Sequence, residues 1–322
     1  MSRGKVRVRV PASTANLGPG FDTLGMALDL HAWIEMGISD QTRIELFGEH
    51  LKGIPSNKNN LIYKIAQQLF TEAGVHHPEL EISMYSDIPL TRGLGSSATA
   101  IIGAMYAANA LIGQPLSDDD IFQLATRMED HPDNVGASLF GGIVAAFWDG
   151  KRAEAVRIEP HERLELLVAI PDFHLSTDKA RHVLPRQVSM KDAVFNVSHS
   201  STLVAALCMG RLDMIQHAMK DALHQPYRGK LIPGMDKILL EATQHGALGI
   251  ALSGAGPTMI AFADREHTDK GKLENFLHDT FLAKGVQTTM MWLKPCASGA
   301  VLLTADDSFR TLIEKIKGEI RA

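Results

Sequence analysis

The hydrophobic positions of this chain switch between two periods along its 322 residues. Valines alternate with charged residues over 6–10, and apolar residues alternate over 80–84, which is the pattern of strands with one wet face. Leu61, Ile65 and Leu69 instead recur every fourth position, which favours a helix over 59–73 that stops at Gly74. The same criteria predict further strands at 32–38, 43–47, 141–148, 155–158, 164–170, 249–252, 258–263, 286–293 and 299–303.

The apolar run over 98–112 is the most hydrophobic helix candidate. It is shorter than the ~20 residues that a bilayer requires, so we expect a helix buried on most sides inside a soluble protein. Ser117 and the three aspartates after it predict a helix start, because a capping serine and first-turn carboxylates stabilise a helix N-terminus; a metal cluster is the alternative. Further helices are predicted at 190–209, 212–223, 235–245, 270–284 and 306–320.

Both halves of the chain mix strands and helices, and the second half fits an α+β layer with helices on one face. A change near Gly150 predicts two domains, 1–155 and 156–322. We find no internal repeat and no low-complexity segment.

Composition narrows the function classes. The net charge is −5 and no long basic tract occurs, so we expect neither nucleic acid nor an anionic membrane as a partner. The N-terminus lacks the apolar core of a signal peptide, and only Cys208 and Cys296 are present. Two cysteines argue against a disulfide framework and favour a reducing, cytoplasmic location.

A glycine-rich turn leads directly into the apolar helix. Residues 88–99 read IPLTRGLGSSAT, and such a turn can point backbone N–H groups at a phosphate while the helix behind it adds its positive dipole end. A plain tight turn with a serine cap is the alternative. The sequence is neither a Walker P-loop nor a Gly-x-Ser-x-Gly nucleophile elbow. We therefore expect a nucleotide triphosphate and phosphoryl transfer.

Three other segments carry residue types that suit such a site. The loop predicted at 11–25 offers Asn16 and Asp22, and an ordinary loop is its alternative. Residues 128–136 crowd carboxylates, a histidine and Asn134 at a helix end, where a carboxylate can face Mg²⁺ and the asparagine can bond a substrate. A helix end with proline termination explains only part of that segment, and zinc is disfavoured. Residues 252–258 are small, which permits close backbone approach.

Together these segments resemble the GHMP kinases, the superfamily that includes galactokinase, mevalonate kinase and homoserine kinase. The motifs at 11–25, 89–99 and 253–258 occur in the family's order, and the resemblance covers roughly 5–303. The forms PASTANLGPGFDTLG and HPDNV are most similar to the homoserine kinase branch. The resemblance implies a two-domain α+β fold, with an N-terminal domain like domain 2 of ribosomal protein S5 and a ferredoxin-like C-terminal domain.

The resemblance also implies a set of site residues. ATP and Mg²⁺ are the expected cofactors, with Ser97 and Glu129 as metal ligands and Asn16, together with Asn57 or Asn60, near the nucleoside. The ATP phosphates are expected on Pro89, Leu90, Thr91, Arg92, Gly93, Leu94, Gly95, Ser96, Ser97, Ala98 and Thr99. The amino-alcohol substrate L-homoserine is expected on Asp22, His131, Asn134, Thr177, Arg181 and Arg228. The residues expected to act in catalysis are Asp22, Glu129, Asn134 and Arg181.

The implied chemistry is transfer of a phosphoryl group from ATP to the hydroxyl of L-homoserine, a step of threonine biosynthesis. Asn134 cannot act as a base, so we expect direct attack by the hydroxyl without a strong protein base. A mevalonate or sugar kinase of the same superfamily and a catalytically silent ligand-binding relative are the alternatives. The resemblance further suggests a homodimer.

Overall fold

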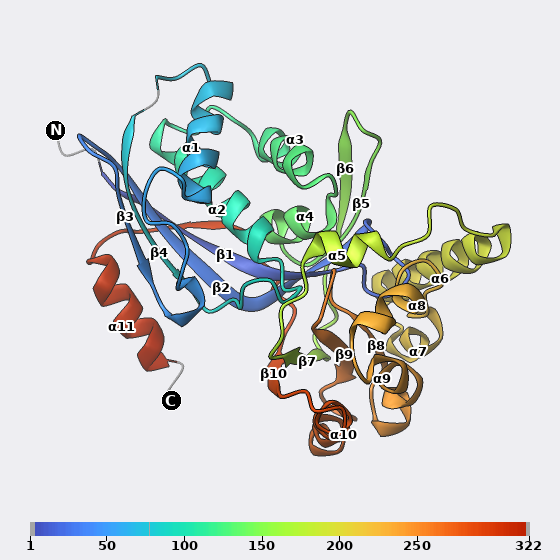
Figure 1. The fold of residues 1–322 in the computed structure, drawn as a ribbon. Coiled ribbons are helices and arrows are strands. Elements are labelled where there is room, and N and C mark those ends of the chain that lie inside the picture. The colour runs from blue at the N-terminus through green and yellow to red at the C-terminus, as the bar shows by residue number, and fades with distance from the viewer. Residues whose placement is uncertain (1–3, 77, 320–322) are drawn as a thin grey trace.

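The computed structural model describes residues 4–76 and 78–319 and contains two β-sheets with helices packed on them (Figure 1). The larger, seven-stranded sheet has the order β11-β1-β2-β4-β3, with β5 and β6 continuing from β2, and the smaller sheet has the order β10-β7-β9-β8. The larger sheet consists of β1 (Val6–Ala15), β2 (Leu24–Ser39), β3 (Arg43–Phe47), β4 (Glu79–Ser86), β5 (Ile143–Trp148), β6 (Ala153–Ile158) and β11 (Val301–Leu303). The smaller sheet consists of β7 (Leu164–Pro171), β8 (Gly249–Leu252), β9 (Met259–Asp264) and β10 (Thr288–Leu293).

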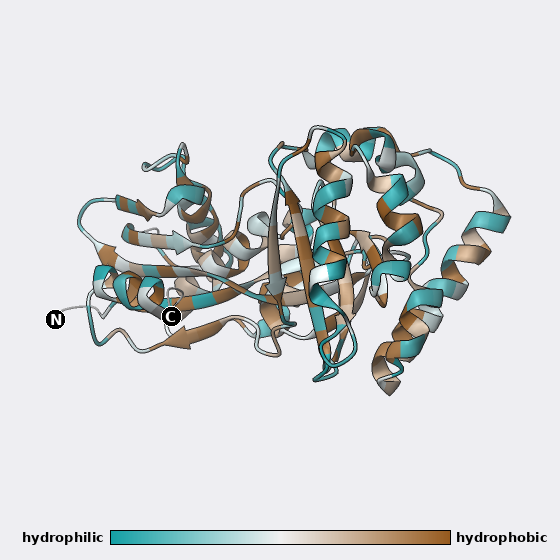
Figure 2. Ribbon diagram, turned by 90° about the horizontal axis from the view of Figure 1, so that it is seen from below, coloured by the Kyte–Doolittle hydropathy of each residue, from teal (hydrophilic) through white to brown (hydrophobic). Residues whose placement is uncertain are grey.

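Most helices follow the predicted positions, and many carry both hydrophilic and hydrophobic residues (Figure 2). The described helices are α1 (Leu61–Glu72), α2 (Ser96–Leu111), α3 (Asp118–Glu129), α4 (Asp133–Phe140), α5 (Thr177–His182), α6 (Met190–Met209), α7 (Ile215–Ala218), α8 (Gln225–Arg228), α9 (Met235–Glu241), α10 (Lys270–Leu282) and α11 (Phe309–Glu319). Within the described ranges, none of these helices combines the length and apolar character needed to span a membrane.

Helix α2 is the centre of the first layer. It packs between α1 and strands β1 and β2, and its side chains from Ala98 to Met105 are almost fully buried. At Gly103 a Cβ atom would lie 2.5 Å from Cδ1 of Ile34, so the glycine lets the helix approach the sheet closely. The prediction of a helix buried on most sides is confirmed.

The opposite face of the larger sheet is covered by the C-terminal helix. Phe309, Ile313 and Ile316 of α11 pack against Trp33 and Tyr85 in a separate apolar cluster. Strand β11 also pairs with β1 in antiparallel register. The predicted second domain, 156–322, therefore differs from the structure at its end, because residues 301–319 pack on the first sheet; the predicted boundary falls inside β6. Ile320, the last residue of the predicted helix, lies outside the described residues.

Two stretches differ from the sequence interpretation in their local structure. Both ends of the predicted loop 11–25 are strand, since β1 continues through Ala15 after a register shift at Pro11/Ala12 and pairs with the start of β2. Only 16–23 remain as a loop, and Asn16, Leu17 and Asp22 adopt positive φ there. The predicted helix over 212–223 is broken, because a 3-10 turn at Leu212–Met214 precedes the short α7.

Candidate active site

One cavity of about 580 Å³ collects most of the residues that the sequence singled out. It lies where the β1–β2 loop, the start of α2, the α3–α4 junction, α5, α8 and the β8–β9 loop meet. Among the predicted residues, the ones that line it are Asn16, Asp22, Thr91, Gly93, Gly95, Ser96, Ser97, Ala98, Glu129, His131, Asn134, Thr177, Arg181 and Arg228.

The N-terminus of α2 opens into this cavity. Gly95 is the N-cap residue in the left-handed conformation, and no side chain caps the helix. The backbone N–H groups of the first turn are therefore available as donors beside the positive end of the helix dipole. This arrangement suits an anionic group such as a phosphate.

Glycines hold the loop before α2 in place from both sides. A Cβ atom on Gly95 would lie 2.1 Å from Oγ of Ser13 in β1, and one on Gly93 would lie 2.3 Å from the carbonyl oxygen of Ser253. The Oγ atom of Ser253 donates a hydrogen bond to the Gly93 carbonyl at 2.6 Å. The three motifs of the sequence thus meet in backbone contacts, which fix the loop that faces the cavity.

Two side chains with oxygen atoms lie beside the helix N-terminus. Ser97 Oγ donates a hydrogen bond to Oε1 of Glu129 at 2.6 Å, from α2 to the end of α3. Both side chains line the cavity. Hydroxyl and carboxylate oxygens are ligands that Mg²⁺ accepts, so these two residues fit the predicted metal site.

Opposite charges form a second pair across the cavity. The guanidinium of Arg181 on α5 donates two hydrogen bonds to the carboxylate of Asp22, at 3.0 and 2.9 Å. Burial alone would lower the pKa of Arg181, but its hydrogen bonds and the charge of Asp22 raise that pKa above its ordinary value. The cavity therefore presents a carboxylate and a guanidinium side by side.

The α3–α4 junction supplies a charged histidine and an amide. His131 Nδ1 lies 2.7 Å from Oδ1 of Asp133, which is almost fully buried. Burial would lower the pKa of His131, but the hydrogen bond to Asp133 and the surrounding carboxylates outweigh it and raise the pKa to about 9. Asn134 accepts a hydrogen bond from Ser13 through Oδ1, so its amide nitrogen is the group left to donate to a ligand.

Arg228 is more deeply buried than expected for an arginine that binds a substrate carboxylate at the protein surface. It is only 2 % exposed, and it donates hydrogen bonds to the carbonyl oxygens of Ala180 and Gly254 and to His224 Nδ1. These bonds use Nε and Nη1, and none of the hydrogen bonds among the described residues engages Nη2. Burial and the nearby Arg181 lower the pKa of Arg228 to about 10.

Several predicted contacts do not reach the cavity or are already engaged. The side chain of Asn16 bonds the Asp22 amide and the Gly254 carbonyl, so it holds the loop together. Asn60 caps α1 through the amide of Ile62, and Thr99 bonds backbone carbonyls while almost fully buried. The remaining predicted loop residues that do not line the cavity are Pro89, Leu90, Arg92 and Leu94.

The sequence interpretation missed some residues that shape the site. Asp133 and Ser13 both lie in the motifs PASTANLGPGFDTLG and HPDNV, but their hydrogen bonds to His131 and Asn134 form only in the folded chain. Gly254, Ala255 and Gly256 line the cavity from the third motif. His224 had no motif to mark it.

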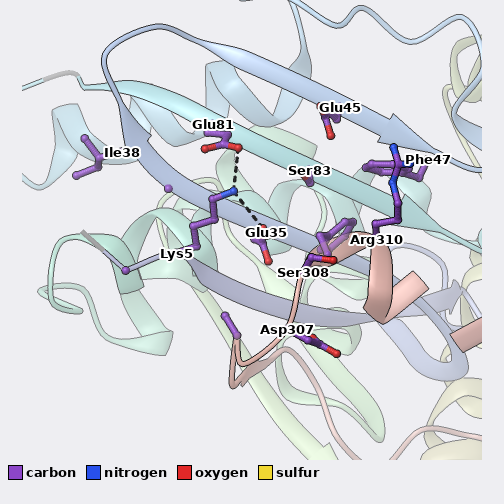
Figure 3. A pocket seen from close by; sticks show the side chains of 14 residues that line it. Lys5, Glu35, Ile38, Glu45, Phe47, Glu81, Ser83, Asp307, Ser308 and Arg310 are labelled. Atoms are coloured by element: carbon purple, nitrogen blue, oxygen red, sulfur yellow. Dashed lines mark hydrogen bonds and ion pairs between the residues drawn. The ribbon is translucent and has the colours of Figure 1, made fainter. Parts of the chain in front are cut away.

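A larger hollow of about 730 Å³ lies elsewhere, between the larger sheet and the segment that leads into α11 (Figure 3). Three of its charged side chains pair with one another, since Lys5 Nζ lies 2.8 Å from Glu81 and 3.5 Å from Glu35. Asp307 pairs with Arg7 and Lys315. None of the predicted site residues lines this hollow, so the smaller cavity is the candidate active site.

The fold and the cavity fit a small-molecule kinase whose glycine-rich loop precedes a buried helix. Residues 60–142 match the family model for the GHMP kinases N terminal domain, and residues 203–279 match that for the GHMP kinases C terminal. The chain belongs to the GHMP kinases, and within them to the homoserine kinase family. The predicted fold class and family are confirmed.

Individual relatives support the assignment over nearly the whole chain. A homoserine kinase from Moorella thermoacetica is 45 % identical over 92 % of this chain and 99 % of its own length. One from Carboxydothermus hydrogenoformans is 42 % identical over 92 % of this chain and 96 % of its own. The crystal structure of homoserine kinase from Cytophaga hutchinsonii superposes with a TM-score of 0.82 at 27 % identity, covering 93 % of this chain and 97 % of that one.

Proposed function

We propose that this protein transfers the γ-phosphoryl group of ATP to the hydroxyl of L-homoserine, giving O-phospho-L-homoserine for threonine biosynthesis. The observation that carries the proposal is the shared cavity, in which the Asp22–Arg181 pair faces the same space as the open N-terminus of α2. The Asp22–Arg181 pair has charges that complement those of an amino acid, and the N-terminus of α2 complements the negative charge of a polyphosphate.

The phosphate side consists of the loop over 89–99 and the first turn of α2. Backbone N–H groups would bind the phosphate oxygens, and the helix dipole would stabilise their charge. Ser97 and Glu129 would hold Mg²⁺, which when bound neutralises charge on the phosphates. These residues position the γ-phosphoryl group, and positioning with charge neutralisation is most of what phosphoryl transfer needs.

The amino-acid side matches the zwitterion of homoserine. Asp22 would accept the ammonium group, while Arg181 and Nη2 of Arg228 would bind the carboxylate. The protonated His131 and the amide of Asn134 would donate to oxygens nearer the reacting end. Fixing both ends of a short substrate orients its terminal hydroxyl toward the phosphate side.

Among the described residues, the side chains that we assign to the two substrates include no free strong base. Asp22 is paired with Arg181, Glu129 is bonded to Ser97, and Asn134 has no useful proton affinity. We therefore propose direct attack by the hydroxyl, with its proton passing to the phosphate oxygens or to solvent. A steep loss of kcat on changing a carboxylate that holds no metal would contradict this.

The test is to incubate the purified protein with ATP and Mg²⁺ and with homoserine, mevalonate or galactose separately. Release of ADP is followed, and the product is identified by phosphorus NMR. We expect turnover with homoserine alone. Turnover of mevalonate or galactose but not homoserine would favour another GHMP kinase activity, and no turnover by folded protein would favour a silent relative. The homodimer and the cytoplasmic location stay predictions; light scattering of the purified protein checks the first.

A further inference from the structure

We propose that His224 is a positioning residue for the amino-acid substrate, acting through Arg228 and through the loop over 16–23. This inference rests on the proposed function, because it concerns how the same cavity recognises a zwitterion. His224 is fully buried and immediately precedes α8 as its N-cap residue. It lies in none of the motifs found in the sequence.

The two ring nitrogens of His224 have different partners. Nδ1 lies 3.1 Å from Nη1 of Arg228, and Nε2 lies 2.8 Å from the carbonyl oxygen of Gly18. A guanidinium can only donate and a carbonyl can only accept, so Nδ1 accepts and Nε2 carries the proton. The hydrogen-bond network thus assigns the neutral Nε2–H tautomer.

The tautomer matters because it fixes the guanidinium of Arg228. Nη1 is shared between His224 and the Gly254 carbonyl, and Nε is bonded to the Ala180 carbonyl. These bonds hold the guanidinium plane from α5, α8 and the β8–β9 loop at once. The geometry therefore leaves Nη2 as the end of Arg228 that can meet a substrate carboxylate.

Phe21 extends the same arrangement to the other charged pair. Its ring stacks on the imidazole of His224, with centroids 5.1 Å apart and planes 23° apart. The guanidinium carbons of Arg228 and Arg181 lie 5.2 and 5.7 Å from the centre of that ring. Because Phe21 precedes Asp22, His224 supports the loop that presents the carboxylate as well as the guanidinium.

Asp221 keeps His224 in place. Its carboxylate is fully buried and accepts hydrogen bonds from the backbone N–H groups of Leu223, His224 and Gln225 at 2.9, 3.0 and 2.7 Å. The turn that carries His224 is therefore rigidly defined before α8 begins. Such preorganisation of a group that touches substrate lowers the cost of binding.

Two isosteric variants separate the two hydrogen bonds. His224→Asn places an amide oxygen near the position of Nδ1 and can still accept from Arg228, whereas His224→Gln places an amide nitrogen near Nε2 and keeps only the bond to Gly18. We expect His224→Gln to raise KM for homoserine about tenfold, the scale of one lost hydrogen bond to a charged group, while kcat and KM for ATP stay within about threefold. His224→Asn loses only the bond to the neutral Gly18 carbonyl, so it should raise KM for homoserine by about threefold, less than His224→Gln, and leave kcat and KM for ATP near their wild-type values.

A double-mutant cycle and a spectrum complete the test. Arg228→Ala should raise KM for homoserine, and adding His224→Gln to it should change KM less than about twofold, because the interaction is already lost. On the wild-type protein, nitrogen NMR of labelled histidine should show the Nε2–H tautomer at His224. The second measurement does not depend on whether a variant folds.

The inference is overturned if both variants raise KM equally, if they lower only Tm, or if the spectrum shows the Nδ1–H tautomer. These outcomes are distinct from failure of the proposed function, in which the wild type itself does not phosphorylate homoserine while the tautomer remains measurable.

Discussion

Three carboxylates in this cavity have different hydrogen-bond partners, and the partner of each indicates what the carboxylate can bind. Asp22 is bonded to a guanidinium, Asp133 to an imidazole and Glu129 to a serine hydroxyl. Among these three carboxylates, Glu129 alone has no cationic hydrogen-bond partner in the described part of the chain. It is therefore the one of the three best able to face a metal cation.

Replacing Glu129 tests this role. Glu129→Gln keeps the shape but removes the charge, so we expect kcat to fall about 100-fold and the Mg²⁺ concentration for half-maximal rate to rise. The rate is measured across a magnesium titration. Asp118→Asn, which removes a carboxylate at the other end of α3, is the control and should leave both values unchanged. Unchanged kinetics in Glu129→Gln would remove the residue from the metal site.

His131 links the site to the pH dependence of stability. Its pKa is about 9 in the folded protein, against about 6.5 in an unfolded chain. Because the pKa of His131 is higher in the folded protein, its protonation makes its full contribution to stability below pH 6.5, and that contribution is lost as the pH rises through 9. We expect the wild type to exceed His131→Gln in free energy of unfolding by about 1–3 kcal/mol at pH 6 and by much less at pH 10.

Urea unfolding at both pH values checks the difference, and comparison with the variant removes the effect of other titrating groups. His50→Gln, a change at an exposed histidine, is the control. A difference between wild type and His131→Gln that does not change with pH would contradict the assignment.

For individual residues, only the family resemblance predicted that side chains far apart in the sequence would lie in one site. The motifs indicated that Asp22, Ser97, Glu129 and Arg181 share a site, and the structure brings them to one cavity. The pairing of each side chain was not predictable, because it depends on packing between segments far apart in the chain. His224 illustrates this, since its partner Gly18 is 206 residues away.

The helices and strands show which hydrophobic patterns predict secondary structure well. Strand β3, helix α6 and strand β8 match their predicted bounds, because each has a clear hydrophobic pattern between turn residues. Helix α4 was missed because its eight residues after Pro132 are too few to show a period. The second half of β1 was predicted as a loop because its Pro, Ala, Ser and Thr residues are typical of loops in composition, whereas the loop over 16–23 is confirmed.

The start of α2 gives a prediction at the scale of one element. Gly95 has φ 67° and a Cβ there would meet Ser13, so Gly95→Ala should cost both backbone strain and overpacking, about 2–4 kcal/mol together. Gly113 has φ 87° with nothing near its Cβ position, so Gly113→Ala should cost only about 1 kcal/mol.

Denaturant unfolding measures both costs, and KM for ATP should rise in Gly95→Ala alone. Equal stability losses in the two variants would mean that Ser13 gives way without cost, and the tight fit would then not explain the glycine.

The whole molecule depends on its C-terminal helix for one face of the larger sheet. Ile313→Ala removes buried apolar contacts in the cluster with Trp33, so we expect a loss of about 2–3 kcal/mol in stability. Because α11 lines no part of the active-site cavity, kcat/KM should not change.

Thermal unfolding followed by tryptophan fluorescence checks the stability. The neighbouring exposed residue gives the control, Glu314→Ala, which should shift stability by no more than about 0.5 kcal/mol. A large loss of activity in Ile313→Ala would mean that the two faces of the sheet are energetically coupled.

The pairing of β1 with β11 has a consequence for biosynthesis. Arg7 lies opposite Leu303 and bonds Asp307, so one edge of the first strand has its neighbour only after some 300 residues have been translated. While the ribosome extends the chain, that edge is exposed to other nascent or misfolded polypeptides. Synthesis of β11, and not the emergence of the N-terminal half, is therefore the event that completes this sheet.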